Sequence, residues 1–248
     1  MDKIVEICCG SYYDAKQAGI GGARRIELNS ALHLGGLTPG ICTLDLVKEN
    51  LDLKVIAMVR PRGAGFHYLE EDFLVMQREC EELMKHGADG IAFGCLMADN
   101  SLDRKKNLAL IEIIRRYHGE AVFHRAFDCT MDPYKVMEDL IGMGVDRVLT
   151  SGQRSKAMEG SALIAGLQKE FGDRIELLAG SGMNAENSRR LMERTGISQV
   201  HSSCKTWQSD PTTSSDYVTY SYAAKPNENC YEVVSSGRVR ELIRSVQD

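Results

Sequence analysis

The sequence has no long apolar segment and no excess of positive charge. No run approaches the ~20 apolar residues of a membrane-spanning helix, so we expect no association with a membrane. The 248 residues carry a formal net charge of −5, which argues against a nucleic-acid partner. Residues 4–8 predict a strand where a signal peptide would lie, which favours a cytoplasmic protein.

Several motifs that would define a catalytic or metal site are also missing. The eight cysteines form no C-x-x-C pair and no zinc-type spacing, as expected for a reduced, cytoplasmic chain. No lysine stands at a predicted strand end, which argues against a Schiff-base aldolase. There is no H-x-H, H-E-x-x-H or G-x-S-x-G motif, which argues against a preassembled zinc site or a serine-hydrolase elbow.

A weak internal repeat indicates the architecture. Four similar segments begin at Gly22, Gly87, Gly144 and Gly196, and each glycine follows a helical pattern and precedes a predicted strand. Four other predicted strands, at 4–8, 55–59, 121–124 and 175–178, alternate with the strands of these copies, which makes eight strands in all. Eight predicted helices have helical periodicity or composition: 14–21, 44–50, 70–86, 105–117, 132–142, 155–171, 184–195 and 238–246.

Strict alternation of strands and helices predicts a parallel sheet. Eight such units in 248 residues favour a closed (β/α)8 TIM barrel of the α/β class, with a single domain over residues 1–248. Residues 209–234 are polar and lack periodicity, so we expect an irregular loop there, before the last helix.

Charged residues gather where two predicted strands end, which is the active face of such a barrel. Arg60 and Arg62 follow residues 55–59, and His124, Arg125 and Asp128 follow residues 121–123. Alternation along the strands places Glu6 and Glu27 opposite their apolar neighbours, most simply in the lumen. A structural ion pair would explain one carboxylate and one arginine, but the convergent set is larger than a core requires.

The polar residues at the predicted strand ends form two candidate groups. Candidate acid–base groups, with Arg60 as an anion holder, are Glu27, Arg60, His124 and Asp128. Candidate anion-binding residues are Arg62, Arg125, Ser151, Gly180, Ser181, Gly182, His201 and Ser202. The Gly-Ser-Gly turn offers backbone N–H groups to a phosphate or carboxylate, although a tight strand-to-helix turn would account for it equally well.

A metal site would depend on sulfur, because thiolates favour Cu(I). Cys8 and Cys9 stand together at the end of the first strand and are the candidate ligands. Neighbouring residues of a strand point to opposite faces, so geometry argues against both binding one ion. The amino-acid composition alone would not make copper the leading prediction for a ligand.

The chain resembles the CutC family of copper homeostasis proteins in segments that run in order from residue 4 to about 209. The matching segments are Glu6-Ile7-Cys8, Gly22 to Leu28, Gly35 to Pro39, Arg60 to Gly63, Phe123 to Asp128, Leu149 to Gln153, Gly180 to Asn187 and Val200 to Ser203. The resemblance implies a cytoplasmic TIM barrel associated with copper tolerance and Cu(I) binding. It implies one thiol ligand at Cys8 and a second at the position of Asn29, where this chain has no cysteine. Cys9 and Cys204 are the alternative second thiols.

The sequence is therefore compatible with three alternative functions. The resemblance favours a copper-binding protein with Cu(I) as its ligand. The strand-end residues favour an enzyme that acts on a small anionic or phosphorylated metabolite by acid–base chemistry. A regulatory or scaffold barrel without catalysis is the third, and since barrels commonly self-associate, we expect a homo-oligomer.

Overall fold

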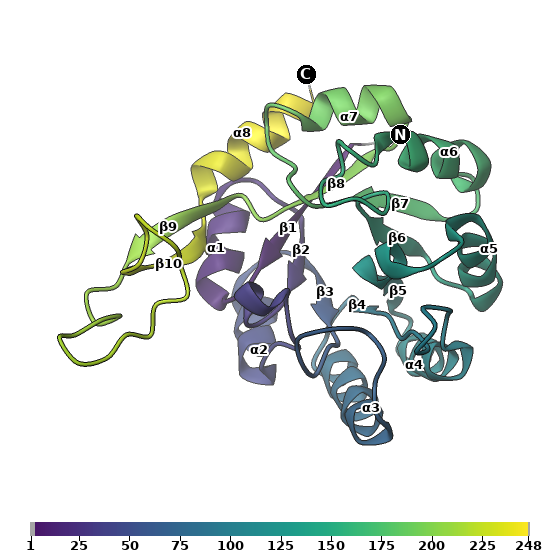
Figure 1. Cartoon of the computed structure of the whole chain (residues 1–248), viewed down its shortest axis with the longest axis horizontal. Helices are drawn as coiled ribbons and strands as arrows, with labels where there is room; N and C mark the ends of the chain where they lie inside the picture. Colours follow the sequence, from purple (N-terminus) through teal and green to yellow (C-terminus); the bar gives the residue numbers. More distant parts are fainter. Residues whose placement is uncertain (1–2, 248) are drawn as a thin grey trace.

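Eight parallel strands close into a barrel in the computed structural model, which describes residues 3–247. The strands follow one another around the barrel in chain order, and β1 pairs with both β2 and β8 (Figure 1). Their bounds are β1 (Ile4–Cys9), β2 (Arg25–Leu28), β3 (Lys54–Met58), β4 (Gly90–Phe93), β5 (Glu120–Phe123), β6 (Arg147–Thr150), β7 (Glu176–Ala179) and β8 (Gln199–Ser202). The predicted (β/α)8 barrel is confirmed.

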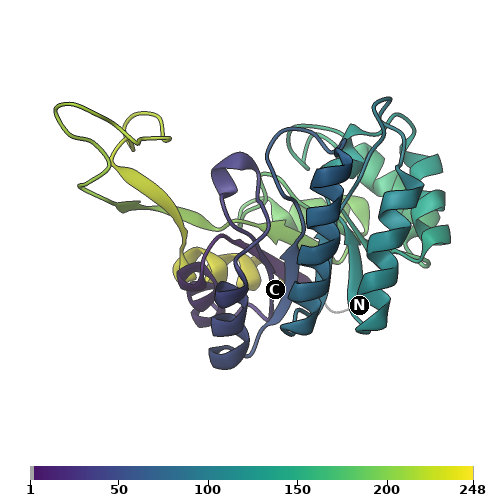
Figure 2. The ribbon, with the colours of Figure 1, turned by 90° about the horizontal axis from the view of Figure 1, so that it is seen from below.

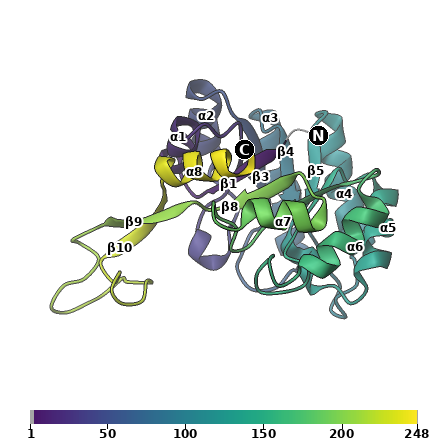
Figure 3. The same ribbon diagram turned by 90° about the horizontal axis from the view of Figure 1, so that it is seen from above.

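In the described part of the chain, residues 3–247, eight helices surround the barrel, one after each strand of the alternating series (Figures 1 and 3). They are α1 (Tyr12–Ile20), α2 (Ile41–Asn50), α3 (Glu70–Lys85), α4 (Arg104–Arg116), α5 (Pro133–Met143), α6 (Ser161–Phe171), α7 (Ser188–Thr195) and α8 (Ser236–Gln247). Two short 3-10 helices, η1 (Leu32–Leu34) and η2 (Arg125–Cys129), lie in loops after β2 and β5.

Helix α6 begins later than the predicted residue 155. The chain after β6 first makes a tight turn, with Gly152 at φ +67° and Gln153 at φ +56°. A Cβ atom on Gly152 would lie 2.3 Å from the carbonyl oxygen of Gly160, so this close approach of two backbone segments requires glycine. Residues 155–160 therefore belong to the loop after β6, and the helix begins at Ser161.

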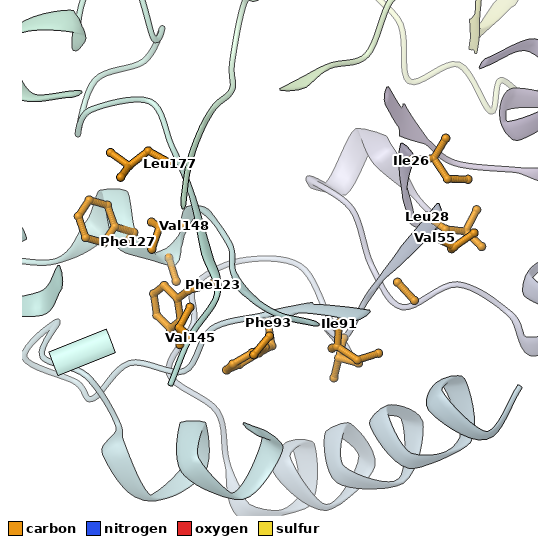
Figure 4. Packing of buried hydrophobic residues seen from close by; sticks show 14 of the residues in the cluster. Ile26, Leu28, Val55, Ile91, Phe93, Phe123, Phe127, Val145, Val148 and Leu177 are labelled. Carbon is orange, nitrogen blue, oxygen red and sulfur yellow. The ribbon is translucent and has the colours of Figure 1, made fainter. Parts of the chain in front are cut away.

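Alternation along the strands divides the buried residues into two layers. The larger layer lies between the strands and the helices, and Figure 4 shows part of it. Its members there include Ile26, Val55, Ile91, Phe93 and Phe123. A smaller apolar cluster fills the lumen beside β3, β4 and β5 and consists of Ile56, Met58, Ala92 and Val122. The rest of the lumen is available to polar side chains.

Charged side chains close the end of the lumen where the strands begin. Arg147 Nε lies 2.8 Å from Glu176 and its Nη2 lies 3.0 Å from Glu120. Lys54 also pairs with Glu120. Because buried charges must be compensated, this network makes the lower part of the barrel a filled core and leaves the opposite end for function.

A two-stranded arm leaves the barrel between β8 and α8. Strands β9 (Lys205–Ser209) and β10 (Cys230–Val234) pair antiparallel and project beside α1 and α8 (Figures 1 and 2). The predicted irregular loop at 209–234 is therefore too long, because its last residues form a strand. The sequence pattern missed this ribbon since two isolated strands bury one face only weakly.

Within residues 3–247, no helix is both long and apolar enough to cross a membrane.

Candidate functional site

Strands β1, β2 and β8 bring Cys8, Glu27 and His201 together at the carboxyl end of the barrel. Cys8 is paired in register with Glu27, and Glu6 is paired with His201 on the other side. One ligand atom from each of Cys8, Glu27 and His201 lies within 4.8 Å of the others. Among the described residues this is the one group of three or more potential metal ligands of the His, Cys, Asp and Glu types.

Asn29 completes the contacts of the thiol and the carboxylate. Its side-chain Nδ2 donates to Glu27 Oε2 at 2.9 Å and lies 3.6 Å from Cys8 Sγ. The Cys8 thiol lies 3.8 Å from the same carboxylate oxygen. Asn29 therefore positions the two potential ligands and is not itself a soft donor.

Glu6 and Arg25 orient the histidine. His201 Nδ1 lies 2.9 Å from Glu6 Oε1, and Arg25 Nε lies 2.7 Å from Glu6 Oε2. The other ring nitrogen, Nε2, lies 3.9 Å from Glu27 Oε2. A carboxylate behind Nδ1 fixes the ring in the way that supporting groups orient metal-binding histidines.

Burial and close charges shift the pKa values of these groups in different directions. Burial raises the pKa of the Cys8 thiol to about 11 and also raises the pKa of Glu27. Burial alone would raise the pKa of Glu6, but Arg25 and His201 lower it to about 2. Burial alone would lower the pKa of His201, but Glu27, Cys8 and Glu6 raise it well above its usual value. The thiol and the imidazole thus hold protons that a metal ion would displace.

Cys9 does not join Cys8. Its side chain lies in the apolar layer outside the barrel, fully buried, with Sγ 3.6 Å from the Ile7 carbonyl oxygen. The alternation of the strand places the two thiols on opposite faces. Cys204 is also buried in the outer layer, so neither alternative thiol lies in the Cys8, Glu27 and His201 group.

The predicted arginine clamp is divided among structural contacts. Arg60 donates to three backbone carbonyl oxygens, those of Leu34 and Gly36 at 3.1 Å and that of Ala64 at 2.6 Å. Arg62 pairs with Asp72 at 2.9 Å. Arg60 thereby joins the loops after β2 and β3, whereas Arg62 ties the loop after β3 to the first turn of α3.

Asp128 and Arg125 belong to the junction between η2 and β6. Asp128 accepts hydrogen bonds from the backbone N–H groups of Ser151 and Gln153, at 3.0 and 3.1 Å, and from the Thr150 hydroxyl at 2.6 Å. Arg125 Nε lies 2.9 Å from Asp128, and its Nη2 donates to the Ser151 hydroxyl at 2.8 Å. The fold brings these residues together, but their polar groups bind one another and form a structural junction.

The Gly-Ser-Gly turn after β7 is likewise used internally. The Ser181 hydroxyl donates to the Ser155 carbonyl oxygen at 2.6 Å, and the Ser202 hydroxyl donates to the Met183 carbonyl oxygen at 2.7 Å. Gly180 packs against His201, where a Cβ atom would lie 3.5 Å from the histidine ring. Gly182 has φ +77°. Helix α7 begins only at Ser188, so its N-terminus lies farther along the chain than predicted.

Cys8, Glu27 and His201 are all candidate site residues on the sequence, but as a metal ligand, an acid–base group and an anion-binding residue respectively. The sequence signal that could have joined them is their common luminal position. Each follows a luminal polar residue two positions earlier on its strand. These residues are, in the same order, Glu6, Arg25 and Gln199. Only closure of the barrel makes β1 and β8 neighbours, so the local pattern did not show that the three meet.

Comparison with known proteins identifies the family. The sequence model of the CutC family matches residues 3–206. A CutC family protein from Treponema denticola is 42% identical over 243 residues, which cover 98% of both chains. The chain belongs to the CutC family.

Further relatives agree with this assignment. The human copper homeostasis protein cutC homolog is 38% identical over 202 residues, covering 82% of this chain and 73% of the human one. The crystal structure of CutC from Streptococcus agalactiae superimposes with a TM-score of 0.77 at 26% identity, covering 81% of this chain and 98% of that one. Phosphoribosyl anthranilate isomerase from Thermococcus kodakaraensis, at 15% identity and a TM-score of 0.58, shares the fold alone.

Proposed function

We propose that this protein serves copper homeostasis in the cytoplasm by binding Cu(I) through Cys8 and His201, with Glu27 beside them. The observation that carries the proposal is the group in which these three side chains lie within 4.8 Å of one another. A thiolate selects Cu(I), and an imidazole is a suitable second copper ligand. The names of the relatives support the copper role.

The donor set fits a single Cu(I) ion that has one sulfur and one nitrogen ligand. His201 Nε2 faces the group while Glu6 holds Nδ1, so one ring nitrogen is left for a metal. Because the thiol and the imidazole both lose protons on binding, Cu(I) affinity should rise with pH. All eight cysteines are free, which suits a reducing compartment.

A Cu(I) competition titration on reduced protein, without oxygen and with a chromogenic chelator, tests this proposal. We expect one Cu(I) per chain in the wild type and a loss of about 100-fold or more in affinity for Cys8→Ser and His201→Phe. Cys9→Ser is the matched control, because it alters the neighbouring thiol on the opposite face. Equal affinity in wild type and Cys8→Ser would show that the site is wrong.

The enzyme alternative has weaker support from the same structure. Arg62 and Arg125 are paired with carboxylates, and the Gly180 to Gly182 turn is occupied by its own contacts. An anionic metabolite bound at these three places would therefore have to displace existing partners. The copper proposal requires no such rearrangement.

We also propose that the protein is a homo-oligomer that associates through the arm of β9 and β10. Large side chains near the arm tip are exposed, with Tyr217 at 93% and Tyr220 at 83%. Exposed apolar side chains that gather on one projecting element are typical of contact surfaces.

A further inference from the structure

Three neighbouring strands end in a row of luminal positions on the side of the barrel opposite β1 and β8. The row consists of Arg60, Gly94 and His124, which follow β3, β4 and β5. Two residues before each of them, on the same face of its strand, stand Met58, Ala92 and Val122. These three residues are paired in register. Backbone hydrogen bonds from Val59 to Ala92 and from His124 to Phe93 continue the ladder to this height. Arg60 and His124 therefore face the lumen from either side of β4.

Gly94 allows the histidine to lean across β4. A Cβ atom on Gly94 would lie 2.7 Å from His124 Nδ1 and Cε1, so no other residue could stand there without moving the ring. Phe66 covers both neighbours, with its ring centre 5.1 Å from Arg60 Cζ and 4.9 Å from the His124 ring. One aromatic ring thus lies over the cationic and the imidazole side chains together.

His124 is a neutral hydrogen-bond donor without an acceptor. Its Nδ1 accepts from the Ala126 backbone N–H at 3.2 Å, which leaves the proton on Nε2. Burial, with the charges of Arg60 and Arg125, lowers its pKa to about 3. The Nε2 atom is buried and has no hydrogen-bond partner among the described residues. A buried donor of this kind is normally satisfied by another group.

Arg60 is a buried cation without a counter-ion. The residue is only 6% exposed, and its side-chain hydrogen bonds go to neutral carbonyl groups. Its Nε atom is buried and unpartnered, and no carboxylate of the described chain pairs with it within 4 Å. Buried charges are normally compensated by an opposite charge. Arg60 and His124 therefore each have a buried N–H group without an acceptor, and a negatively charged acceptor would also neutralise Arg60.

We propose that Arg60 and His124 bind a small oxyanion of carboxylate size beneath Phe66. The anion would accept from Arg60 Nε and His124 Nε2 and would neutralise the guanidinium. The Tyr68 hydroxyl is also buried and lies beside Arg60, so it is a further polar group at this site. This site uses β3 and β5, so it does not depend on the copper proposal at β1, β2 and β8.

Isothermal titration with formate and with acetate, each replacing chloride at constant ionic strength, tests the site on copper-free protein. We expect saturable binding of one anion per chain in the wild type. His124→Phe should raise the dissociation constant at least about tenfold, because it removes one hydrogen bond to a charged ligand. His118→Asn, at an exposed loop position, is the matched control and should bind as the wild type does.

Histidine-labelled NMR of the wild type gives a result that needs no variant. The His124 Nε2 resonance should move as formate is added and should stop moving at saturation. Absence of a saturable change would overturn the proposal and would indicate a buried water at these donors. Equal affinity in folded His124→Phe would also overturn it, since that outcome indicates an adventitious ion only. Unchanged Cu(I) affinity in His124→Phe separates this site from the copper site.

Discussion

Two luminal histidines of this barrel have different charge states: His201 is a cation and His124 is neutral. His201 lies between the carboxylates of Glu6 and Glu27, which raise its pKa, whereas His124 lies near Arg60 and Arg125 in an apolar pocket, and its pKa falls to about 3. Both are buried, so burial alone does not distinguish them. The sign of the nearest charges decides whether each ring is a cation or a neutral donor.

His124 should make the stability of the protein depend on pH in acid. The unfolded chain binds a proton near pH 6.5, whereas the native chain does so only near pH 3. The unfolded state therefore holds more protons between these values, and the free energy of unfolding falls as pH falls through this window. In anion-free buffer we expect His124→Gln to reduce this slope by up to about 1.4 kcal/mol per pH unit.

Urea unfolding at a series of pH values between 7 and 4 measures the effect. His118→Asn serves as the control, because that position is exposed and should keep the slope of the wild type. A slope in His124→Gln equal to that of the wild type would contradict the assignment of a neutral buried imidazole.

At the scale of elements, Asp128 joins η2 to the end of β6. Its carboxylate accepts bonds from Thr150, Ser151 and Gln153 and pairs with Arg125. These donors come from a strand end and the turn after it, which have few other partners. One carboxylate thus fixes the angle at which the chain leaves β6.

Asp128→Asn should destabilise the protein by about 2–4 kcal/mol. The amide accepts fewer bonds and turns an N–H group toward donors that are already close, so buried donors lose their acceptors. Asp139→Asn, which breaks an exposed pair with Arg104, should change stability by no more than about 1 kcal/mol. Denaturant unfolding of both variants measures the difference, and equal effects would show that Asp128 is not a structural centre.

At the scale of the whole molecule, closure of the barrel creates the candidate copper group, and the arm adds a projecting surface. A hydrogen bond of 2.8 Å from the Asp210 N–H to the Asn229 carbonyl oxygen brings together the two ends of the irregular part of the arm. The barrel strands make no register pairs with β9 or β10. Removal of the arm tip should therefore leave the barrel folded.

Replacement of residues 211–228 by two glycines should convert the proposed oligomer to a monomer. The expected cause is the loss of the exposed side chains of Tyr217, Val218 and Tyr220. Size-exclusion chromatography with light scattering gives the mass, and Cu(I) titration checks that the barrel site is intact. An unchanged assembly in the shortened chain, or a monomeric wild type, would contradict association through the arm.

The sequence by itself determined the fold, the number of strands in the barrel and the luminal direction of Glu6 and Glu27. These depend on local patterns, namely apolar runs, glycine at helix ends and alternation along a strand. The start of α6 was predicted less well, because the approach of Gly152 to Gly160 is a contact between backbone segments and has no periodic signal.

Only the tertiary structure decided which polar residues belong together. Closure joins β8 to β1 and brings His201 to Cys8, while the alternation of β1 turns Cys9 away. Arg60, Arg62 and Arg125 look alike as charges after a strand, yet one lacks a counter-ion and two are paired with carboxylates. The partner of a long side chain depends on which loop returns to it, and that is a long-range property of the folded chain.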